Sequence, residues 1–280
     1  MNQRIVLLCA EVRKNKMVRM THRTIKKMEQ NQNNINIKAT GKLAGEAAGK
    51  DIEEYISKIQ GKQDTIRIIF AAAPSQTAML DYIAKSTIID WTKIVAFHMD
   101  EYIGLPVGAE QHFAEYLKAN LFSKVPLKAY HVLNTKGDID QQMAEYTKLI
   151  NEAPIDIVCL GIGENGHIAF NDPPVADFND PETIKVVELD KECRIQQVND
   201  KCFSELNKVP KSALTLTIPA LTGGKKLFCV VLGATKSEAV KNTLTGNISE
   251  ACPASILTSH PDCTFYFDEE AYQKVKQVSI

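Results

Sequence analysis

Residues 65–73 read Thr65-Ile66-Arg67-Ile68-Ile69-Phe70-Ala71-Ala72-Ala73, which is a nearly continuous apolar run. A turn, Pro74-Ser75-Gln76, follows at once, and we expect a helix from there through Lys85. A short apolar run that leads into a helix is typical of a strand buried on both faces of a parallel sheet. Similar apolar runs occur three more times along the chain, in Lys93–Phe97, Ile155–Leu160 and Lys226–Leu232.

The regular pattern begins at residue 35. Ile35–Ala39 alternates like a strand, and Leu43–Ile59 has helical spacing. We therefore predict an α/β fold, with a doubly wound, mostly parallel sheet that carries helices on both faces (Rossmann-like), as a single domain over residues 35–280. Residues 1–34 are rich in Lys and Arg, and we expect a basic, poorly ordered N-terminal extension there.

Composition excludes several classes of protein. The chain has 280 residues, of which 44% are hydrophobic and 24% charged, as in ordinary globular proteins. Its 33 Lys and Arg nearly cancel its 34 Asp and Glu, so we predict no nucleic-acid and no membrane partner. No apolar stretch approaches the roughly eighteen residues that a membrane span needs. The cysteines include no C-x-x-C pair, so we expect no metal site and a reducing, cytoplasmic location.

The chemistry is expected where the apolar runs end. Ligands of an open parallel sheet bind beyond the carboxyl ends of its strands, where the strand order switches. Four segments follow the runs: Ala73-Pro74-Ser75-Gln76-Thr77, His98-Met99-Asp100-Glu101-Tyr102, Gly161-Ile162-Gly163-Glu164-Asn165-Gly166-His167 and Gly233-Ala234-Thr235-Lys236. If the strands are parallel, these four loops share one edge. Their carboxylates, histidine and lysine suit acid–base chemistry on an anionic, polyhydroxylated small molecule.

The third loop contains a false lead. Gly161 to Gly166 satisfy the G-x-G-x-x-G pattern of dinucleotide-binding folds. That motif requires a long helix to begin at the glycines, whereas Asn171-Asp172-Pro173-Pro174 follows four residues after Gly166 and would break such a helix. We therefore predict no nicotinamide cofactor, and no other cofactor is indicated.

The four loops also carry a resemblance. The matching stretches are Met99-Asp100-Glu101-Tyr102-Ile103-Gly104-Leu105, Leu160 to Pro173 (LGIGENGHIAFNDP), Val209-Pro210-Lys211-Ser212-Ala213-Leu214-Thr215 and Leu232-Gly233-Ala234-Thr235-Lys236. In this order, and over roughly residues 35–270, the chain resembles the glucosamine-6-phosphate deaminase (isomerase) family, which is related to the 6-phosphogluconolactonases. Together these stretches are specific, although any one of them could occur by chance.

The resemblance implies an enzyme, with a phosphosugar as its small-molecule partner. The implied reaction is aldose–ketose isomerisation with deamination, from glucosamine 6-phosphate and water to fructose 6-phosphate and ammonia. Asp100 is implied to move a proton between C2 and C1, and His167 to open the pyranose ring. Asp172 and Asn165 belong to the same catalytic set.

The implied binding residues are a larger set. They are Ser75, Gln76, Thr77, Glu101, Gly163, Gly166, Arg194 and Lys236, with Lys236 in contact with the phosphate. Two features fit these tasks independently. A neighbouring Glu101 can move the pKa of Asp100, and helix N-terminal amides after Ser75 can cradle an anion.

The chain departs from the family at several positions. The family's phosphate loop is usually rich in Gly, Ser and Thr, whereas this chain has Ala71-Ala72-Ala73-Pro74-Ser75-Gln76. Asp172 stands where glutamate is usual, and Gln196 and Gln197 intrude where a phosphate-binding arginine near Arg194 is expected. These departures leave the preferred sugar phosphate and the retention of turnover open.

Three alternatives remain beside the deaminase. A 6-phosphogluconolactonase-like hydrolase is disfavoured by His167-Ile168-Ala169-Phe170-Asn171, because lactonases typically read GHTAS at that point. A sugar-phosphate-sensing transcription regulator needs a DNA-binding domain, and residues 1–34 are too short for one. A relative that binds phosphosugar without turnover also fits the altered loops, and a homo-oligomer is left open.

Overall fold

Seven strands form the main sheet of the computed structural model, which describes residues 34–278. Their order is β1-β10-β9-β6-β2-β3-β5, and all neighbours from β10 to β5 are parallel. The strands are β1 (Ile35–Lys38), β2 (Ile66–Phe70), β3 (Ile94–His98), β5 (Ala129–His131), β6 (Ile157–Leu160), β9 (Lys226–Val231) and β10 (Cys263–Asp268). After β2 the chain adds β3 and β5 on one side, and it then returns to add β6 on the other side. The strand order therefore switches between β2 and β6.

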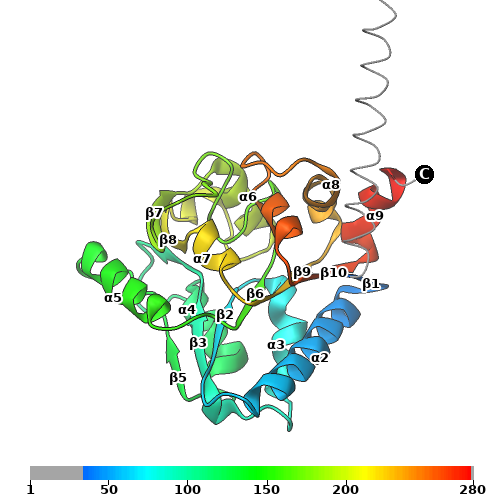
Figure 1. The fold of residues 1–280 in the computed structure, drawn as a ribbon. Coiled ribbons are helices and arrows are strands. Elements are labelled where there is room, and N and C mark those ends of the chain that lie inside the picture. Colours follow the sequence, from blue (N-terminus) through cyan, green and yellow to red (C-terminus); the bar gives the residue numbers. More distant parts are fainter. Residues whose placement is uncertain (1–33, 279–280) are drawn as a thin grey trace, which may run out of the picture. The chain divides into compact units, whose positions relative to one another are not determined.

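The helices cover both faces of this sheet. They are α2 (Gly41–Gln60), α3 (Thr77–Ala84), α4 (Phe113–Leu117), α5 (Ile139–Asn151), α6 (Lys191–Asn199), α7 (Ile218–Thr222), α8 (Ser237–Thr245) and α9 (Glu269–Val278). In Figure 1, α2 and α3 lie on one side of β2 and β3, and α5 lies on the other. The predicted doubly wound α/β fold is confirmed. The predicted extension, residues 1–34, lies outside the described residues except for Asn34.

Alternation along the strands explains the two layers. Ile66, Ile68 and Phe70 of β2 belong to the hydrophobic core cluster that includes the apolar face of α2 and α3. Residues of the opposite parity face α5, where the ring of Phe97 meets that of Tyr146 with centroids 6.1 Å apart. Helices cover both faces of these strands, so both the odd- and the even-numbered residues are buried. This is why the apolar runs in the sequence are continuous rather than alternating.

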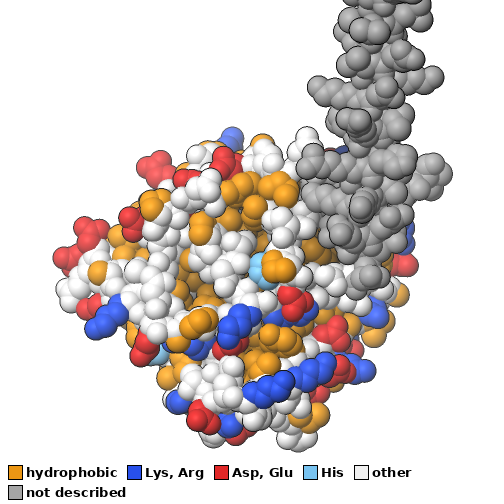
Figure 2. All heavy atoms as spheres, in the orientation of Figure 1, with side chains coloured by type: hydrophobic (Ala, Val, Ile, Leu, Met, Phe, Trp, Pro, Cys, Tyr) orange, Lys and Arg blue, Asp and Glu red, His pale blue; other side chains and the backbone are white. Residues whose placement is uncertain are grey.

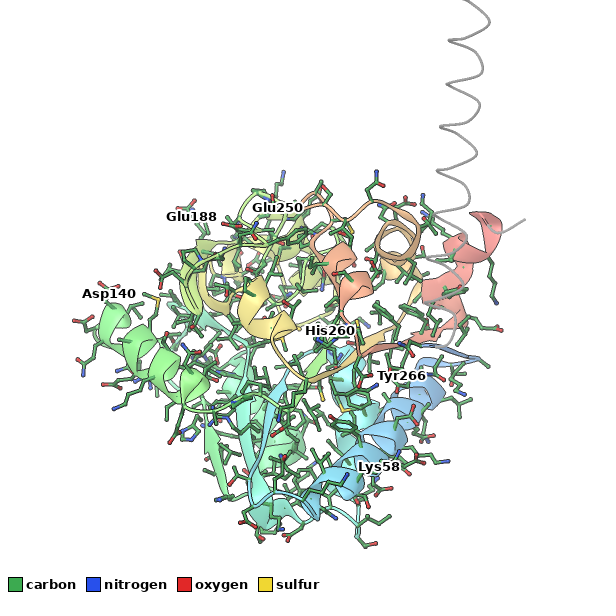
Figure 3. The ribbon with its side chains drawn as sticks, in the orientation of Figure 1. Lys58, Asp140, Glu188, Glu250, His260 and Tyr266 are labelled. Carbon is green, nitrogen blue, oxygen red and sulfur yellow. The ribbon has the colours of Figure 1, made fainter. Side chains whose placement is uncertain are left out.

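Buried side chains also link helix to strand. Tyr266 of β10 lies between the sheet and α2, where its hydroxyl donates to Asp51 at 2.7 Å (Figure 3). Lys58 at the end of α2 and Asp140 at the start of α5 instead project from the surface (Figure 3). Thr40 caps α2 by accepting a hydrogen bond from the Leu43 N–H, which satisfies one of the free donors of the first turn.

A second, three-stranded sheet was not predicted. It has the order β4-β8-β7 and is antiparallel, with β4 (Asp100–Ile103), β7 (Ile184–Glu188) and β8 (Ser212–Leu216). The interpretation of Asp100 to Tyr102 as a loop after the second run is therefore wrong. These residues leave β3 and pair with β8, and Leu216 N donates to Met99 O at 2.7 Å. The partner strand lies more than a hundred residues later, so no local pattern indicates this pairing.

Among the described residues, no helix is both long enough and apolar enough to cross a membrane.

Candidate active site

One cleft of about 360 Å³ lies at the carboxyl edge of the main sheet, where the strand order switches. All four loops that the sequence placed at one edge contribute to its wall. They supply Ala71 to Ser75 after β2, Met99 and Asp100 after β3, Gly161 to Gly163 and His167 after β6, and Leu232, Gly233 and Lys236 after β9. The parallel register of these four neighbouring strands is the reason that the loops meet.

Asp100 begins β4 and faces the cleft. It is only 8% exposed, and its carboxyl group makes no hydrogen bond to any residue between 34 and 278. Burial raises the pKa of Asp100 well above its ordinary value, and the neighbouring Glu101 carboxylate raises it further. A carboxyl with a raised pKa can both accept and return a proton near neutral pH.

His167 is held by a second carboxylate. Its Nδ1 lies 2.8 Å from Asp172 Oδ1, and Asp172 also accepts hydrogen bonds from Asn165 Nδ2 at 2.9 Å and from Asp190 N at 3.3 Å. Burial alone would raise the pKa of Asp172, but the hydrogen bonds from His167 and Asn165 outweigh it and lower the pKa. Asp172 is therefore ionised, and it orients the imidazole so that Nε2 is the ring nitrogen left for a ligand.

Two glycines of the third loop are required by close contacts. A Cβ at Gly163 would overlap the imidazole ring of His167, so this position must lack a side chain. Gly166 has φ +87°, in the left-handed region, and a Cβ there would lie 2.8 Å from Cys252 Sγ. No helix follows Gly166 before β7, as the sequence predicted. The glycines thus shape a tight loop under His167.

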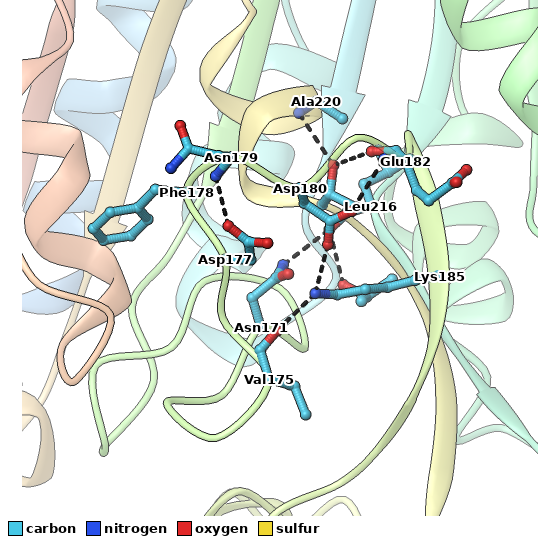
Figure 4. Close-up of polar contacts among 12 residues, drawn as sticks. Asn171, Val175, Asp177, Phe178, Asn179, Asp180, Glu182, Lys185, Leu216 and Ala220 are labelled. Atoms are coloured by element: carbon cyan, nitrogen blue, oxygen red, sulfur yellow. Dashed lines mark hydrogen bonds and ion pairs between the residues drawn. The ribbon is translucent and has the colours of Figure 1, made fainter.

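The loop after His167 is fastened to the small sheet. Asn171 Nδ2 donates to Ile168 O at 3.0 Å and to Leu216 O on β8 at 2.9 Å. Farther on, Lys185 Nζ donates to Val175 O and to the Asp180 carboxylate, at 2.7 and 2.8 Å (Figure 4). These bonds join the segment around Asp172 to β7 and β8, so the small sheet positions the partner of His167.

Lys236 is the one Lys or Arg that lines the cleft among the residues the structure describes. Its ammonium is buried and makes no hydrogen bond there, and its nearest acidic oxygens are Glu164 Oε1 and Asp200 Oδ2, each at 3.9 Å. Burial lowers the pKa of Lys236, and the two carboxylates partly offset this effect. The three donors of its ammonium are available to a ligand.

Glu101 was predicted to bind substrate, but it does not line the cleft. Its carboxylate accepts hydrogen bonds from the N–H groups of Tyr102, Phe113 and Ala114 at 2.9, 3.2 and 3.0 Å, and His112 Nδ1 lies 3.1 Å away. It therefore caps the start of α4 from the inside of the protein. Its contribution to the cleft is through the pKa of Asp100.

Gln76 and Thr77 also lie outside the cleft wall. Gln76 is fully buried, and its Nε2 donates to Ser75 Oγ at 3.0 Å and to Val230 O at 3.3 Å, so it ties the first loop to β9. Thr77 Oγ1 shares a hydrogen bond with Tyr116 Oη at 2.7 Å. Of the predicted Ser75–Thr77 segment, Ser75 alone faces the cleft.

Arg194, predicted as a phosphate ligand, points away from the cleft. Its guanidinium donates to Leu206 O at 2.7 Å and to Val209 O at 3.0 Å, which fastens α6 to the chain before β8. Gln196 and Gln197 line the cleft in its place. The same helix that carries Arg194 thus presents two amides to the cleft, whereas the Arg194 guanidinium is engaged by backbone carbonyls of the chain before β8.

Several cleft residues were missed. They are Phe113, Ala169, Phe170, Gln196, Gln197, Asp200, Cys202 and Asp268. A signal existed for some of them. One helical face, with the spacing i, i+3, i+4, i+7, carries Cys193, Gln196, Gln197 and Asp200. A helical face that packs into the core would be apolar, so the polar residues on this face indicate a site.

One group of side chains has the composition of a metal site. The ligand atoms of His167, Asp172 and Cys193 lie within 4.8 Å of one another. However, His167 Nδ1 already pairs with Asp172, and burial together with Asp172 raises the pKa of the Cys193 thiol well above its ordinary value. A neutral thiol beside an engaged carboxylate is a poor cation ligand, so the group is better described as a buried hydrogen-bonded cluster.

Comparison with known proteins agrees with this geometry. A model of the family described as "Glucosamine-6-phosphate isomerases/6-phosphogluconolactonase" matches residues 39–265. The glucosamine-6-phosphate deaminase of Bacillus thuringiensis (strain Al Hakam) is 33% identical over 239 residues, which cover 85% of this chain and 87% of that protein.

Solved structures share the fold. A monomeric glucosamine-6-phosphate deaminase superposes with a TM-score of 0.76 at 27% identity, covering 85% of this chain and 98% of that one. The 6-phosphogluconolactonase of Thermotoga maritima superposes with a TM-score of 0.68 at 19% identity, covering 84% and 98% of the two chains. At 19% identity, the superposition on the lactonase shows only that the two proteins share a fold.

The position of Glu101 leads to a stability prediction. Replacing Glu101 with alanine would leave three buried N–H groups without an acceptor, and each such group costs about 1–3 kcal/mol. We expect Glu101→Ala to lower the free energy of unfolding by at least about 2 kcal/mol in a urea titration. The matched control is Glu110→Ala, an exposed carboxylate in the same segment, which should change stability by less than about 0.5 kcal/mol. Equal, small effects would contradict the capping role.

The raised pKa of Asp100 makes stability depend on pH. Its carboxyl ionises near pH 3.9 in an unfolded chain and at higher pH in the folded protein. Ionisation of the buried Asp100 carboxyl destabilises the folded protein. This destabilisation is therefore absent below about pH 4 and grows with pH until the pH passes the folded-state pKa. We expect Asp100→Asn to raise the free energy of unfolding at pH 8, and the gain to vanish towards pH 4. Urea titrations at several pH values measure it, and a pH-independent difference would contradict the burial argument.

Proposed function

Because this chain belongs to the family of glucosamine-6-phosphate isomerases and 6-phosphogluconolactonases, we propose that it is an enzyme that isomerises a 2-amino aldose to a ketose and releases ammonia. Glucosamine 6-phosphate, converted with water to fructose 6-phosphate and ammonia, is the reference reaction, after the names of the deaminase relatives. The chemistry takes place at C1 and C2, so the proposal for the reaction does not depend on the group at the far end of the sugar.

A single observation supports this reaction best. Asp100 and His167 line the same cleft, His167 is paired with Asp172, and the pKa values of the Asp100 and Asp172 carboxyl groups are moved in opposite directions. Asp172 is kept ionised to orient a histidine, whereas Asp100 is made a better proton acceptor and donor. Two titratable groups whose environments separate their pKa values are a sign of divided acid–base roles.

The proposed steps follow from these roles. His167 Nε2 transfers the proton of the C1 hydroxyl to the ring oxygen, which opens the pyranose to an aldehyde. The Asp100 carboxylate then takes the proton from C2, and the ammonium group at C2 gives one of its protons to the C1 oxygen, which leaves a neutral enolamine. Asp100 returns the proton to C1, which leaves an iminium at C2. Water adds to C2, and ammonia leaves as the ketone forms, so that one water is consumed and one ammonia released.

The Asp100→Asn variant tests the reaction. Proton transfer by a positioned base contributes about 10²–10⁴-fold to rate, so this variant should lose kcat by that factor. Ammonia and ketose are measured together, with glucosamine 6-phosphate and with glucosamine as substrates. Asp140→Asn, an exposed position on α5, should keep wild-type activity. If wild type releases no ammonia from either sugar, the proposed function is wrong.

The role of His167 is tested separately. His167→Gln should lower kcat/KM by about 10²-fold or more for a substrate that must be opened from a pyranose. A three-carbon 2-amino aldose can close neither a five- nor a six-membered ring and needs no ring opening, so it should lose much less. Equal losses on the two substrates would show that His167 does not act on the ring oxygen.

A further inference from the structure

The cleft has an end for the reacting carbons and an end for the phosphate. Asp100 follows β3 and Lys236 follows β9, and the order β9-β6-β2-β3 sets these strand ends roughly 14 Å apart, at about 4.8 Å an interval. Gln76 Nε2 donates to Ser75 Oγ at 3.0 Å and to Val230 O of β9 at 3.3 Å, which holds Ser75 toward the Lys236 side. We therefore place the 6-phosphate of the proposed substrate beside Lys236, Ser75 and the backbone N–H groups at the helix start after β2, with C1 and C2 toward Asp100.

Helix α6 runs along the cleft from one end to the other. Near its start, Cys193 Sγ lies within 4.8 Å of the ligand atoms of both His167 and Asp172. Just after its last residue, Asp200 Oδ2 lies 3.9 Å from Lys236 Nζ. Cys193 and Asp200 are two helical turns apart on one face, which corresponds to about 10 Å along the helix axis. This face of α6 therefore spans the distance from the reacting end to the phosphate end.

Gln197 lies midway on that face. It follows Cys193 by four residues and precedes Asp200 by three, a spacing that keeps all three on the same side of the helix. Gln197 lines the cleft and is only 7% exposed, and its side-chain amide makes no hydrogen bond to any residue between 34 and 278. Buried polar groups are normally hydrogen-bonded, so the partner of this amide is expected in the cleft.

The neighbouring polar side chains of the wall are already engaged. Gln196 Oε1 accepts from Glu164 N at 2.8 Å, and its Nε2 donates to Asp200 Oδ2 at 3.2 Å. Asp268 accepts from two backbone N–H groups at 3.0 and 2.8 Å. Of the two amides that line the cleft in the described part of the chain, Gln197 is the one left free for a ligand.

A free amide at this place matches the middle of a sugar. Between the reacting carbons C1 and C2 and the phosphate at C6, a hexose carries neighbouring hydroxyl groups at C3 and C4. An amide oxygen accepts a hydrogen bond and the amide nitrogen donates, so one glutamine can bind one hydroxyl as acceptor and the next as donor. Inversion at C3 or C4 moves a hydroxyl away from this pair of contacts.

We propose that Gln197 binds the C3 and C4 hydroxyl groups of the amino-sugar 6-phosphate and so determines which epimer is accepted. This inference rests on the proposed function, which fixes the reacting end and the phosphate end of the substrate. Gln197 is a specificity-determining residue, whereas Gln196 is a positioning residue that holds Asp200 and the Glu164 backbone.

The first experiment removes each partner of the contact in turn. On the full 280-residue chain, kcat/KM is measured with glucosamine 6-phosphate and with its 3-deoxy and 4-deoxy analogues. Wild type should lose about three- to tenfold with each analogue, through KM rather than kcat. Gln197→Met keeps the length of the side chain without its amide, so it should lose about tenfold or more with glucosamine 6-phosphate and less than about twofold further with either analogue.

The ratio between sugars separates binding from general damage, because a damaged fold lowers all three values alike. Deoxy penalties that are the same in Gln197→Met as in wild type would overturn the inference, as would a wild type without such penalties. Gln197→Ala gives the same comparison with a smaller side chain. The matched control is Gln273→Met, the same substitution at an exposed position of α9, which should keep the wild-type penalties.

The second experiment tests the choice of epimer. Wild type should discriminate between glucosamine 6-phosphate and its C4 epimer, galactosamine 6-phosphate, by about tenfold in kcat/KM, and Gln197→Met by less than about threefold. Equal discrimination by the two proteins would show that another residue reads C4 and would overturn the inference, while the proposed function would stand.

The third experiment measures binding without turnover. 2-Amino-2-deoxyglucitol 6-phosphate has no aldehyde and cannot react, and it is titrated calorimetrically, beside its 4-deoxy analogue, into wild type and Gln197→Met. We expect the loss of the C4 hydroxyl to weaken binding about three- to tenfold in wild type and less than about twofold in the variant. If no amino sugar releases ammonia, the proposed reaction fails and this titration still decides the role of Gln197. Equal losses in the two proteins, or no binding by wild type at millimolar ligand, would overturn the inference.

Discussion

The parallel register of β9, β6, β2 and β3 is the constraint on which the rest of this structure depends. Because these four strands run side by side in one direction, the segments that follow them are brought to one edge although they lie far apart in sequence. Between β2 and β6, where the strand order switches, the loops that follow the two strands leave a cleft at the edge of the sheet. The alanines after β2 and the glycines before His167 line this cleft. The cleft is a consequence of topology first and of side chains second.

Burial in that cleft then separates the chemistry of similar groups. Asp100 and Asp172 are both buried aspartates, but Asp172 receives hydrogen bonds from His167, Asn165 and a backbone N–H, whereas Asp100 receives none from the described residues. Desolvation dominates at Asp100 and hydrogen bonding dominates at Asp172, so their pKa values move apart. The same chemical group is thereby suited to two tasks within one site.

On the face seen in Figure 2, acidic and basic side chains are interspersed around the rim, and no extended single-sign patch gathers there. His260, labelled in Figure 3, donates from its Nε2 to Gly224 O at 2.9 Å. It is a structural histidine, unlike His167, because a backbone carbonyl occupies the nitrogen that a ligand would need.

The small sheet, β4-β8-β7, positions both aspartates of the site. It turns Asp100 out of the end of β3 into a paired strand, and it anchors the segment that carries Asp172 through Asn171 and Leu216. Asp100 is therefore held on a strand of the small sheet, and Asp172 lies on a loop that the same sheet anchors through Asn171. A paired strand restricts the backbone more than a loop does, which favours a fixed geometry at the reacting carbons.

The sequence by itself determined the layered α/β fold, the four loops at one edge, and the cleft positions of Ser75, Asp100, Gly163, His167 and Lys236. It could do so because strand burial and helix periodicity are local patterns, and because strand direction in a parallel sheet follows from the alternation of helix and strand. The tertiary structure alone decided the rest. It showed β4 pairing with a distant β8, Glu101 and Arg194 bonded to backbone groups away from the cleft, and Glu164 and Asp200 beside Lys236. Each of these depends on which residues from separate elements come within a few ångströms, and hydrogen bonding and charge balance at that range are not encoded in any one segment.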